Sequence, residues 1–105
     1  EGLGDIVKVT RPAAGIRSAW AQYSIETERR DELKAHLQAK GIPSVIYYVK
    51  PLHLQTAYKH YMVAPGGLPV SEALPSRILS LPMHAYLSEE DQERVIAAIR
   101  EFHGK

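Results

Sequence analysis

The stretch Val45-Ile46-Tyr47-Tyr48-Val49-Lys50-Pro51-Leu52-His53-Leu54-Gln55-Thr56-Ala57-Tyr58 runs from an apolar segment through a proline into a polar and aromatic one. Its tyrosines, lysine and histidine place many hydroxyl, ammonium and imidazole groups in a short segment. Each buried hydroxyl or ring nitrogen would need a hydrogen-bond partner, which makes the stretch a poor candidate for an ordinary core strand. We therefore expect it to form a surface that contacts something else.

Strand and helix patterns alternate on the amino-terminal side of this stretch. Residues 18–27 are rich in aromatic and β-branched side chains with period-two alternation, which predicts a strand. Residues 28–40 have the leucine spacing, acidic first turn and closing Gly41 of a helix. Residues 44–49 then predict a second strand, which ends at Lys50 because a residue before proline favours extended geometry.

The carboxyl-terminal half continues the alternation. Ser88 is a capping residue that predicts a final helix, with an apolar stripe on one side. Pro75 should end or kink the helix before it. The remaining expected elements are an extended segment over 5–15, short helices over 54–61 and 69–74, a loop over 64–67 and a strand over 78–82.

These elements predict an α+β fold. We expect a two-layer sandwich in which a small, mainly antiparallel sheet of three or four strands carries helices on one face. With 105 residues, of which 45% are hydrophobic and 24% charged, the chain is expected to be a single domain with its own core, residues 1–105.

Composition gives no sign of a nucleic-acid or membrane partner. A net charge of +1 with interspersed signs gives no reason to expect nucleic acid or an anionic membrane surface, and no apolar run approaches the roughly 20 residues of a membrane-spanning helix. The chain has no cysteine, which is compatible with the cytoplasm. It opens without methionine or a signal-peptide pattern, which raises the possibility that it was cut from a longer protein.

No motif for catalysis or metal binding is evident. The histidines lack the three- or four-residue spacing of metal ligands, and His36 and His103 are expected to be solvated near helix ends. His53 and His84 each follow a proline at a strand exit and could be structural or functional. The acidic residues 89–91 are explained by the helix dipole, and we predict no catalytic residue and no metal ligand in this chain.

Four segments in order resemble the carboxyl-terminal domain of the DegT-type sugar aminotransferases, which are pyridoxal-phosphate enzymes of the aspartate-aminotransferase-like fold. They are Ser18-Ala19-Trp20-Ala21-Gln22-Tyr23, Arg30-Asp31-Glu32-Leu33 with Gly41-Ile42, Pro51-Leu52-His53-Leu54-Gln55 with Tyr58, and Leu79-Ser80-Leu81-Pro82-Met83-His84. The resemblance implies a small domain that contributes to an active-site mouth at a homodimer interface. It also implies that pyridoxal 5'-phosphate and its lysine belong to a large domain outside these residues, so that this chain alone binds no cofactor and is inactive.

The resemblance further implies transfer of an amino group, usually from glutamate, to a keto sugar attached to a nucleotide. Members typically show His-Tyr-Pro-x-Pro-Leu-His, in which this chain has Tyr47 and Val49 in place of the histidine and the first proline. Tyrosine can still hydrogen-bond but carries no charge near neutral pH. We predict that the substrate-binding residues are Tyr47, Tyr48, Lys50 and His53.

Two other functions stay open from the residues alone. The chain could be a stand-alone module that binds a small ligand without chemistry. It could also be a structural or interaction domain that uses Trp20 or the tyrosine pair as its contact.

Overall fold

The computed structural model describes residues 2–105, which build a three-stranded antiparallel sheet. The strands are β1 (Lys8–Val9), β2 (Tyr23–Glu26) and β3 (Ile78–Leu81), with β2 in the middle. Ile25 lies opposite both Val9 and Leu79. An isolated bridge between Val45 and Ser80 extends the sheet at the free edge of β3.

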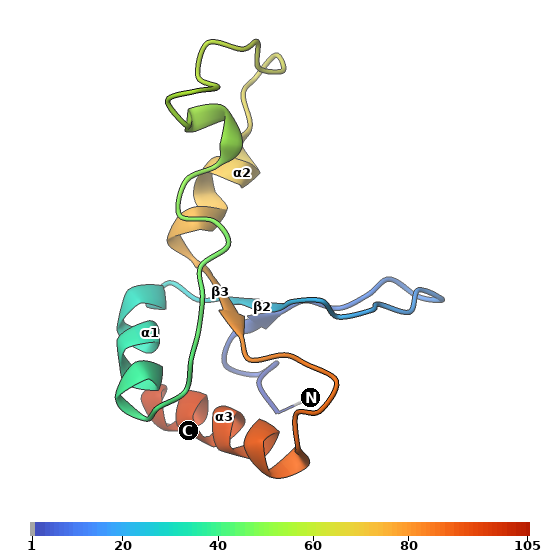
Figure 1. The fold of residues 1–105 in the computed structure, drawn as a ribbon, viewed down its shortest axis with the longest axis vertical. Coiled ribbons are helices and arrows are strands. Elements are labelled where there is room, and N and C mark those ends of the chain that lie inside the picture. The colour runs from blue at the N-terminus through green and yellow to red at the C-terminus, as the bar shows by residue number, and fades with distance from the viewer. Residues whose placement is uncertain (1) are drawn as a thin grey trace.

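Helices α1 (Arg30–Ala39) and α3 (Glu89–Phe102) pack together below the sheet in Figure 1. Ser88 caps α3, because its hydroxyl oxygen accepts a hydrogen bond from the backbone N–H of Asp91 at 3.1 Å. Alternation along the strands turns Ile25 and Leu79 toward the helices, where they are completely buried with Leu33, Leu37 and Ile99.

The opposite face of the sheet is polar. The hydroxyls of Ser24 and Ser80 are 2.8 Å apart, and Lys8 forms an ion pair with Glu26 at 2.6 Å. The sheet is therefore apolar on the helix side and polar on the other, which is the usual pattern of an antiparallel sheet with one covered face. The predicted α+β class, with its small antiparallel sheet and helices on one face, is confirmed.

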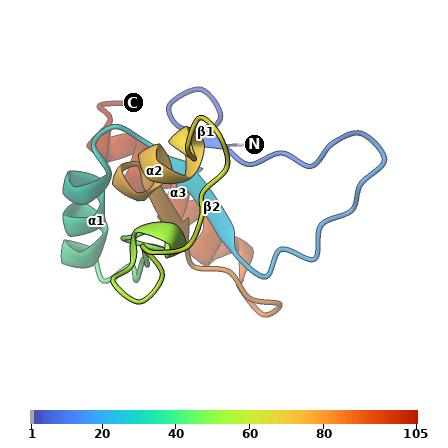
Figure 2. The same ribbon diagram turned by 90° about the horizontal axis from the view of Figure 1, so that it is seen from above.

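Two segments project from this body (Figures 1 and 2). One is a loop over residues 10–22. The other, which we call the arm, comprises residues 46–77 and contains the 3₁₀ turn η1 (Leu52–Leu54), helix α2 (Pro69–Ala73) and the 3₁₀ turn η2 (Leu74–Ser76). They raise the radius of gyration to 15.7 Å, against about 13 Å for a compact chain of this length.

The prediction of a strand over 44–49 is wrong, because only Val45 pairs with the sheet. Val45 exchanges both backbone hydrogen bonds with Ser80, but the next carbonyl at this edge of β3, that of Ile78, accepts a hydrogen bond from the guanidinium of Arg30 at 3.3 Å. On the other side of the bridge, Pro43 and Pro82 lack the N–H that pairing needs. The chain therefore leaves the sheet immediately after Val45.

The helix predicted over 54–61 is also wrong. Residues 52–61 form η1 followed by separate turns, including Tyr58 N–H to the carbonyl of Gln55 at 2.9 Å. Within residues 52–61 no residue is buried, so the apolar side chains of this segment have no core to pack against. A helix this short is marginal without such packing.

Other expected bounds shift for local reasons. The strand predicted over 18–27 begins only at Tyr23, because Trp20 has a φ of 49° that interrupts extended geometry. The segment 5–15 contains a turn before β1. Pro75 is accommodated in η2, where a 3₁₀ turn replaces the α-helix whose hydrogen bonding the proline would interrupt.

Candidate functional site

The two predicted tyrosines lie at the start of the arm, just after the sheet edge. Their rings meet edge to face with centroids 5.5 Å apart. Tyr48 is 69% exposed and Tyr47 39% exposed, and Lys50 next to them is also exposed. The structure therefore places two aromatic faces, two hydroxyls and an ammonium group on an accessible surface, where they can stack on a flat ring and bind oxygen atoms.

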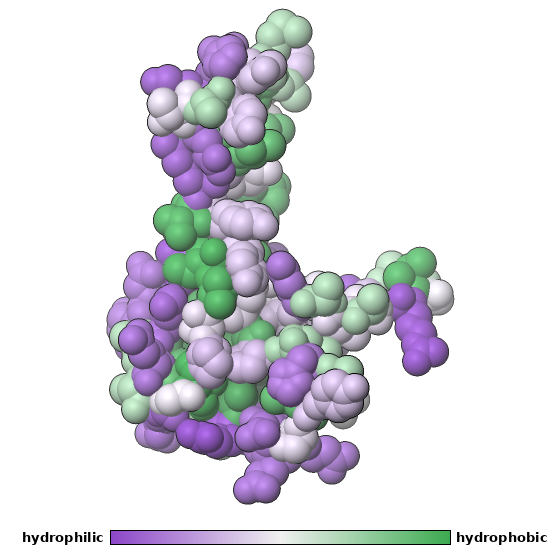
Figure 3. Space-filling model, in the orientation of Figure 1, coloured by the Kyte–Doolittle hydropathy of each residue, from purple (hydrophilic) through white to green (hydrophobic). Residues whose placement is uncertain are grey.

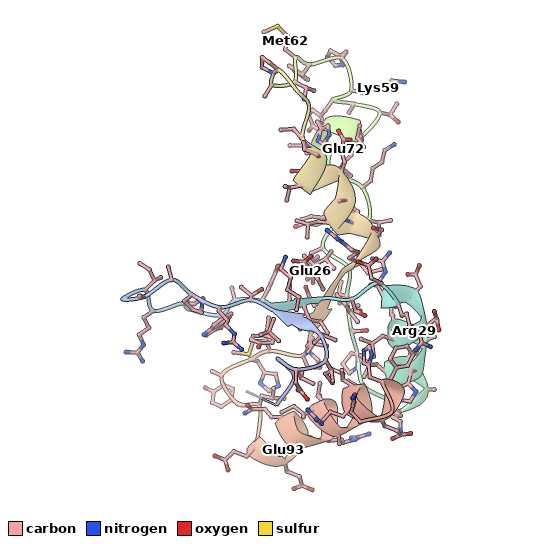
Figure 4. All side chains as sticks on the ribbon, turned by 180° about the vertical axis from the view of Figure 1, so that it is seen from behind. Glu26, Arg29, Lys59, Met62, Glu72 and Glu93 are labelled. Atoms are coloured by element: carbon pink, nitrogen blue, oxygen red, sulfur yellow. The ribbon has the colours of Figure 1, made fainter. Side chains whose placement is uncertain are left out.

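His53 occupies a different part of the arm, in η1. Its Nε2 is 3.1 Å from Oε1 of Glu72 in α2, and its side chain is 15% exposed. A carboxylate only accepts hydrogen bonds, so Nε2 carries the hydrogen and Nδ1 is the nitrogen left for another partner. Glu72 thus holds the ring of His53 in one orientation across the arm; Figure 4 shows Glu72 on the arm's helix.

A hollow of about 500 Å³ lies beside His53. Its lining is mostly apolar and aromatic and includes Leu52, Tyr58, Tyr61 and Leu68 as well as His53. Tyr47, Tyr48 and Lys50 do not line it. The structure therefore brings the predicted residues together as two groups, the tyrosine pair with Lys50 and the histidine with the hollow.

The charges of the arm favour an anionic or oxygen-rich ligand. The arm carries the cations of Lys50, Lys59 and Arg77 but a single carboxylate, that of Glu72, and His53 adds a further nitrogen donor. Apolar side chains lie between these polar ones, and Figure 3 shows both kinds along the arm. A surface that mixes aromatic rings with cationic donors suits a ligand with a ring, hydroxyls and phosphates.

The lysines give no sign of an anchoring site for an aldehyde cofactor. Lys8 and Lys40 are paired with Glu26 and Glu101, at 2.6 and 2.7 Å, and no lysine in residues 2–105 is buried. A lysine that acts as a nucleophile toward a carbonyl group needs a desolvated or otherwise activated amine. No lysine in residues 2–105 is desolvated by burial in this way.

Two histidines expected to be solvated are only partly exposed. Nε2 of His36 is 3.1 Å from the carbonyl oxygen of Ala98, which joins α1 to α3. Nε2 of His103 is buried without a hydrogen-bond partner in the described part of the chain. His84 makes a local contact, since its Nδ1 accepts a hydrogen bond from the N–H of Tyr86 at 3.2 Å.

Neither a metal cluster nor a membrane helix is found within residues 2–105. No group of three histidine, aspartate or glutamate side chains there could hold a metal ion. Over the same residues, every helix is too short or too polar to cross a bilayer.

Sequence reasoning missed Glu72 and the role of Arg30. Glu72 lies 19 residues from His53, and no local pattern connects them. Arg30 stood within a quoted motif, but its contacts with the end of the arm depend on the tertiary fold. The one available signal was that the helix pattern places Arg30 on the same buried side as Leu33 and Leu37, where a charged side chain needs hydrogen-bond partners.

Comparisons with known proteins agree on one family. The model of the DegT/DnrJ/EryC1/StrS aminotransferase family matches residues 1–100. A crystal structure of such an aminotransferase from Brucella abortus is 78% identical, with a TM-score of 0.97 over 99% of this chain and 28% of that one.

Two curated relatives are named for nucleotide sugars. The dTDP-3-amino-3,4,6-trideoxy-alpha-D-glucose transaminase of Streptomyces venezuelae is 41% identical over 83 residues, which are 79% of this chain and 22% of that protein. The UDP-N-acetyl-3-dehydro-alpha-D-glucosamine 3-aminotransferase of Acidithiobacillus ferrooxidans is 41% identical over 98 residues, 93% of this chain and 26% of that protein. The chain thus spans about a quarter of the length of these relatives. The match over residues 1–100 confirms the family resemblance of the sequence, and the chain belongs to the DegT/DnrJ/EryC1/StrS aminotransferase family.

Proposed function

We propose that these residues form the carboxyl-terminal small domain of an enzyme that transfers an amino group, from glutamate, to a keto sugar attached to a nucleotide. The observation that carries the proposal is the family match over residues 1–100, together with relatives named as transaminases of dTDP- and UDP-linked sugars. Pyridoxal 5'-phosphate supplies the amino-transfer chemistry when it is bound. The lysines of residues 2–105 support placing its anchor in another part of the polypeptide, since none of them is buried.

The arm would bind the nucleotide sugar. Tyr47 and Tyr48 offer hydroxyls and aromatic faces, Lys50 offers a positive charge for a phosphate, and His53 offers its free Nδ1. Neutral imidazole would accept a hydrogen bond from a sugar hydroxyl at Nδ1, whereas the protonated ring would donate to a phosphate oxygen. These residues bind and orient the substrate, and no proton transfer is assigned to them.

The enzyme would be a homodimer in the cytoplasm, with glutamate as the second substrate. The exposed apolar side chains of the arm support an intermolecular or interdomain contact, because large apolar surfaces on an isolated chain often mark an interface. The lack of cysteine is compatible with a reducing compartment.

The test compares the 105-residue chain with the full-length polypeptide after each is mixed with pyridoxal phosphate and passed through gel filtration. We expect only the longer protein to retain cofactor absorbance above about 400 nm. It should then form 2-oxoglutarate from glutamate in the presence of a keto sugar nucleotide. Cofactor retained covalently by the 105 residues alone would contradict the assignment of the anchoring lysine to another part of the protein.

A further inference from the structure

Arg30 is a buried charged side chain that the proposed substrate site does not use. It stands in the first turn of α1, and its side chain is 8% exposed. Its Nη1 donates to the carbonyl oxygens of Pro75, at 2.7 Å, and Ile78, at 3.3 Å, while Nε donates to Asp31 at 2.7 Å. Burial of a guanidinium is costly, so these hydrogen bonds must offset the loss of water.

Both carbonyls lie where the arm returns to the sheet. Pro75 is in η2, the last turn of the arm, and Ile78 is the first residue of β3. In the part of the chain that the structure describes, the bond to Pro75 is the only hydrogen bond between α1 and the arm. The planar side chain of Arg30 therefore joins helix α1, the end of the arm and the edge of the sheet.

The neighbouring contacts fasten the same point. The N–H of Thr27 donates to the carbonyl of Arg77 at 3.0 Å, and the guanidinium of Arg77 lies 3.7 Å from Glu26 and 3.6 Å from Glu28. At the other end, where the arm leaves the sheet, the Val45–Ser80 bridge is the one backbone pairing in the described residues that ties the chain to the sheet. No residue of the arm is fully buried, although Ile46 at its start packs against the core. Within the described residues, the direction of the arm therefore depends on these contacts at its two ends.

We propose that Arg30 is a positioning residue for nucleotide-sugar binding, which fixes the direction of the arm by clamping the carbonyls of Pro75 and Ile78. The proposal rests on the proposed function of the arm. The arm carries Tyr47, Tyr48, Lys50 and His53, so a change in its direction moves all four relative to the rest of the site. Lysine would replace Arg30 poorly, because a guanidinium offers a planar fork of donors and an ammonium group only a compact point charge.

The experiment uses the full-length enzyme with Arg30→Met and Arg30→Lys. We expect Arg30→Met to raise the KM for the keto sugar nucleotide about tenfold, by loss of charge-assisted hydrogen bonds, and Arg30→Lys to raise it by less. The half-reaction with glutamate alone should keep its wild-type rate in both variants. Arg29→Met is the matched control, since Arg29 pairs with exposed Glu32 and lies over Phe102 rather than at the arm. It should leave the KM unchanged.

A second measurement reads the arm directly. Hydrogen exchange of the arm amides should be about tenfold faster in the Arg30 variants, with the amides of α3 unchanged. A wild-type KM in both variants, or an equal loss in the glutamate half-reaction and in sugar binding, would overturn the positioning role. If Arg30→Met does not fold, the KM and exchange of Arg30→Lys decide the question. If the wild-type enzyme transfers no amino group to a nucleotide sugar, the proposed function fails, whereas the exchange data still show whether Arg30 holds the arm.

Discussion

The two ring nitrogens of His53 have different surroundings, and the proposed binding role depends on that difference. Nε2 faces Glu72 and Nδ1 is free, so the ring is already oriented before a substrate arrives. Replacing His53 with alanine in the full-length enzyme should raise the KM for the nucleotide sugar about tenfold, because one oriented hydrogen bond is lost. Steady-state kinetics with varied sugar nucleotide at saturating glutamate measure this change.

His60 supplies the matched control for that experiment. It is an exposed histidine on the same arm, whose ring lies 4.5 Å from that of Tyr61 and does not line the hollow beside His53. His60→Ala should leave the KM unchanged. A wild-type KM for His53→Ala, or equal effects of the two substitutions, would remove His53 from the substrate site.

Single residues also show what the sequence could predict about the site. His53 was predicted from its place after a proline and from its fit to a family pattern, and both are local features. Its orientation by Glu72 could not be predicted, because that contact exists only when η1 and α2 lie side by side. The choice of His53, Tyr47, Tyr48 and Lys50 as ligands stays a prediction until binding is measured.

The helix α3 is joined to the amino-terminal turn by one ion pair whose pH dependence can be predicted. Arg100 donates to both carboxylate oxygens of Asp5, at 2.9 and 3.0 Å, and to the carbonyl of Gly2 at 2.8 Å. The hydrogen bond from Arg100 lowers the pKa of Asp5 below its ordinary value of 3.8. A lowered folded-state pKa stabilises the protein above the ordinary value, and this contribution is lost as the pH falls through the folded-state pKa.

Asp5→Asn should therefore reduce the resistance of the protein to urea above about pH 5, and the difference from wild type should shrink below about pH 4. The effect should be small and should weaken in high salt, because both side chains are partly exposed. Glu93→Gln is the control on the same helix, where the side chain points into solvent (Figure 4). A difference between Asp5→Asn and wild type that does not change with pH would show that the ion pair contributes nothing to folding.

Elements with complete local signals were the ones that the sequence predicted correctly. The last helix has a capping serine, an acidic first turn and an apolar stripe, and it forms over Glu89–Phe102 as expected. The segment 44–49, which was expected to be a strand, has β-branched and aromatic residues, but only Val45 finds a backbone partner in the sheet. Its pairing ends because Arg30 occupies the next carbonyl of β3, a contact between segments 48 residues apart that no strand propensity reports.

At the scale of the whole molecule, the distribution of burial divides the chain into a body and an arm. The completely buried side chains all lie on β2, β3, α1 and α3, whereas the arm exposes large apolar side chains up to Met62, which is fully exposed. Such a segment loses conformational entropy on ordering and gains little burial in return. We therefore expect the arm to be ordered by contact with other protein. The partner would be either a second copy or the part of a longer polypeptide that corresponds to the other three quarters of its relatives.

Hydrogen exchange can test this division by comparing the 105-residue chain with the full-length polypeptide. In the short chain, we expect amides of the arm to exchange at rates close to those of an unfolded peptide, while amides of α1 and α3 are protected. In the longer protein, the arm amides should slow by at least about tenfold, because the apolar side chains become covered and local opening becomes costly. The amides of α3 serve as the internal reference, since that helix is packed in the body of both proteins. Equal exchange of the arm in the two proteins would show that nothing covers it, and the arm would then act as a free binding surface rather than as part of a closed active site.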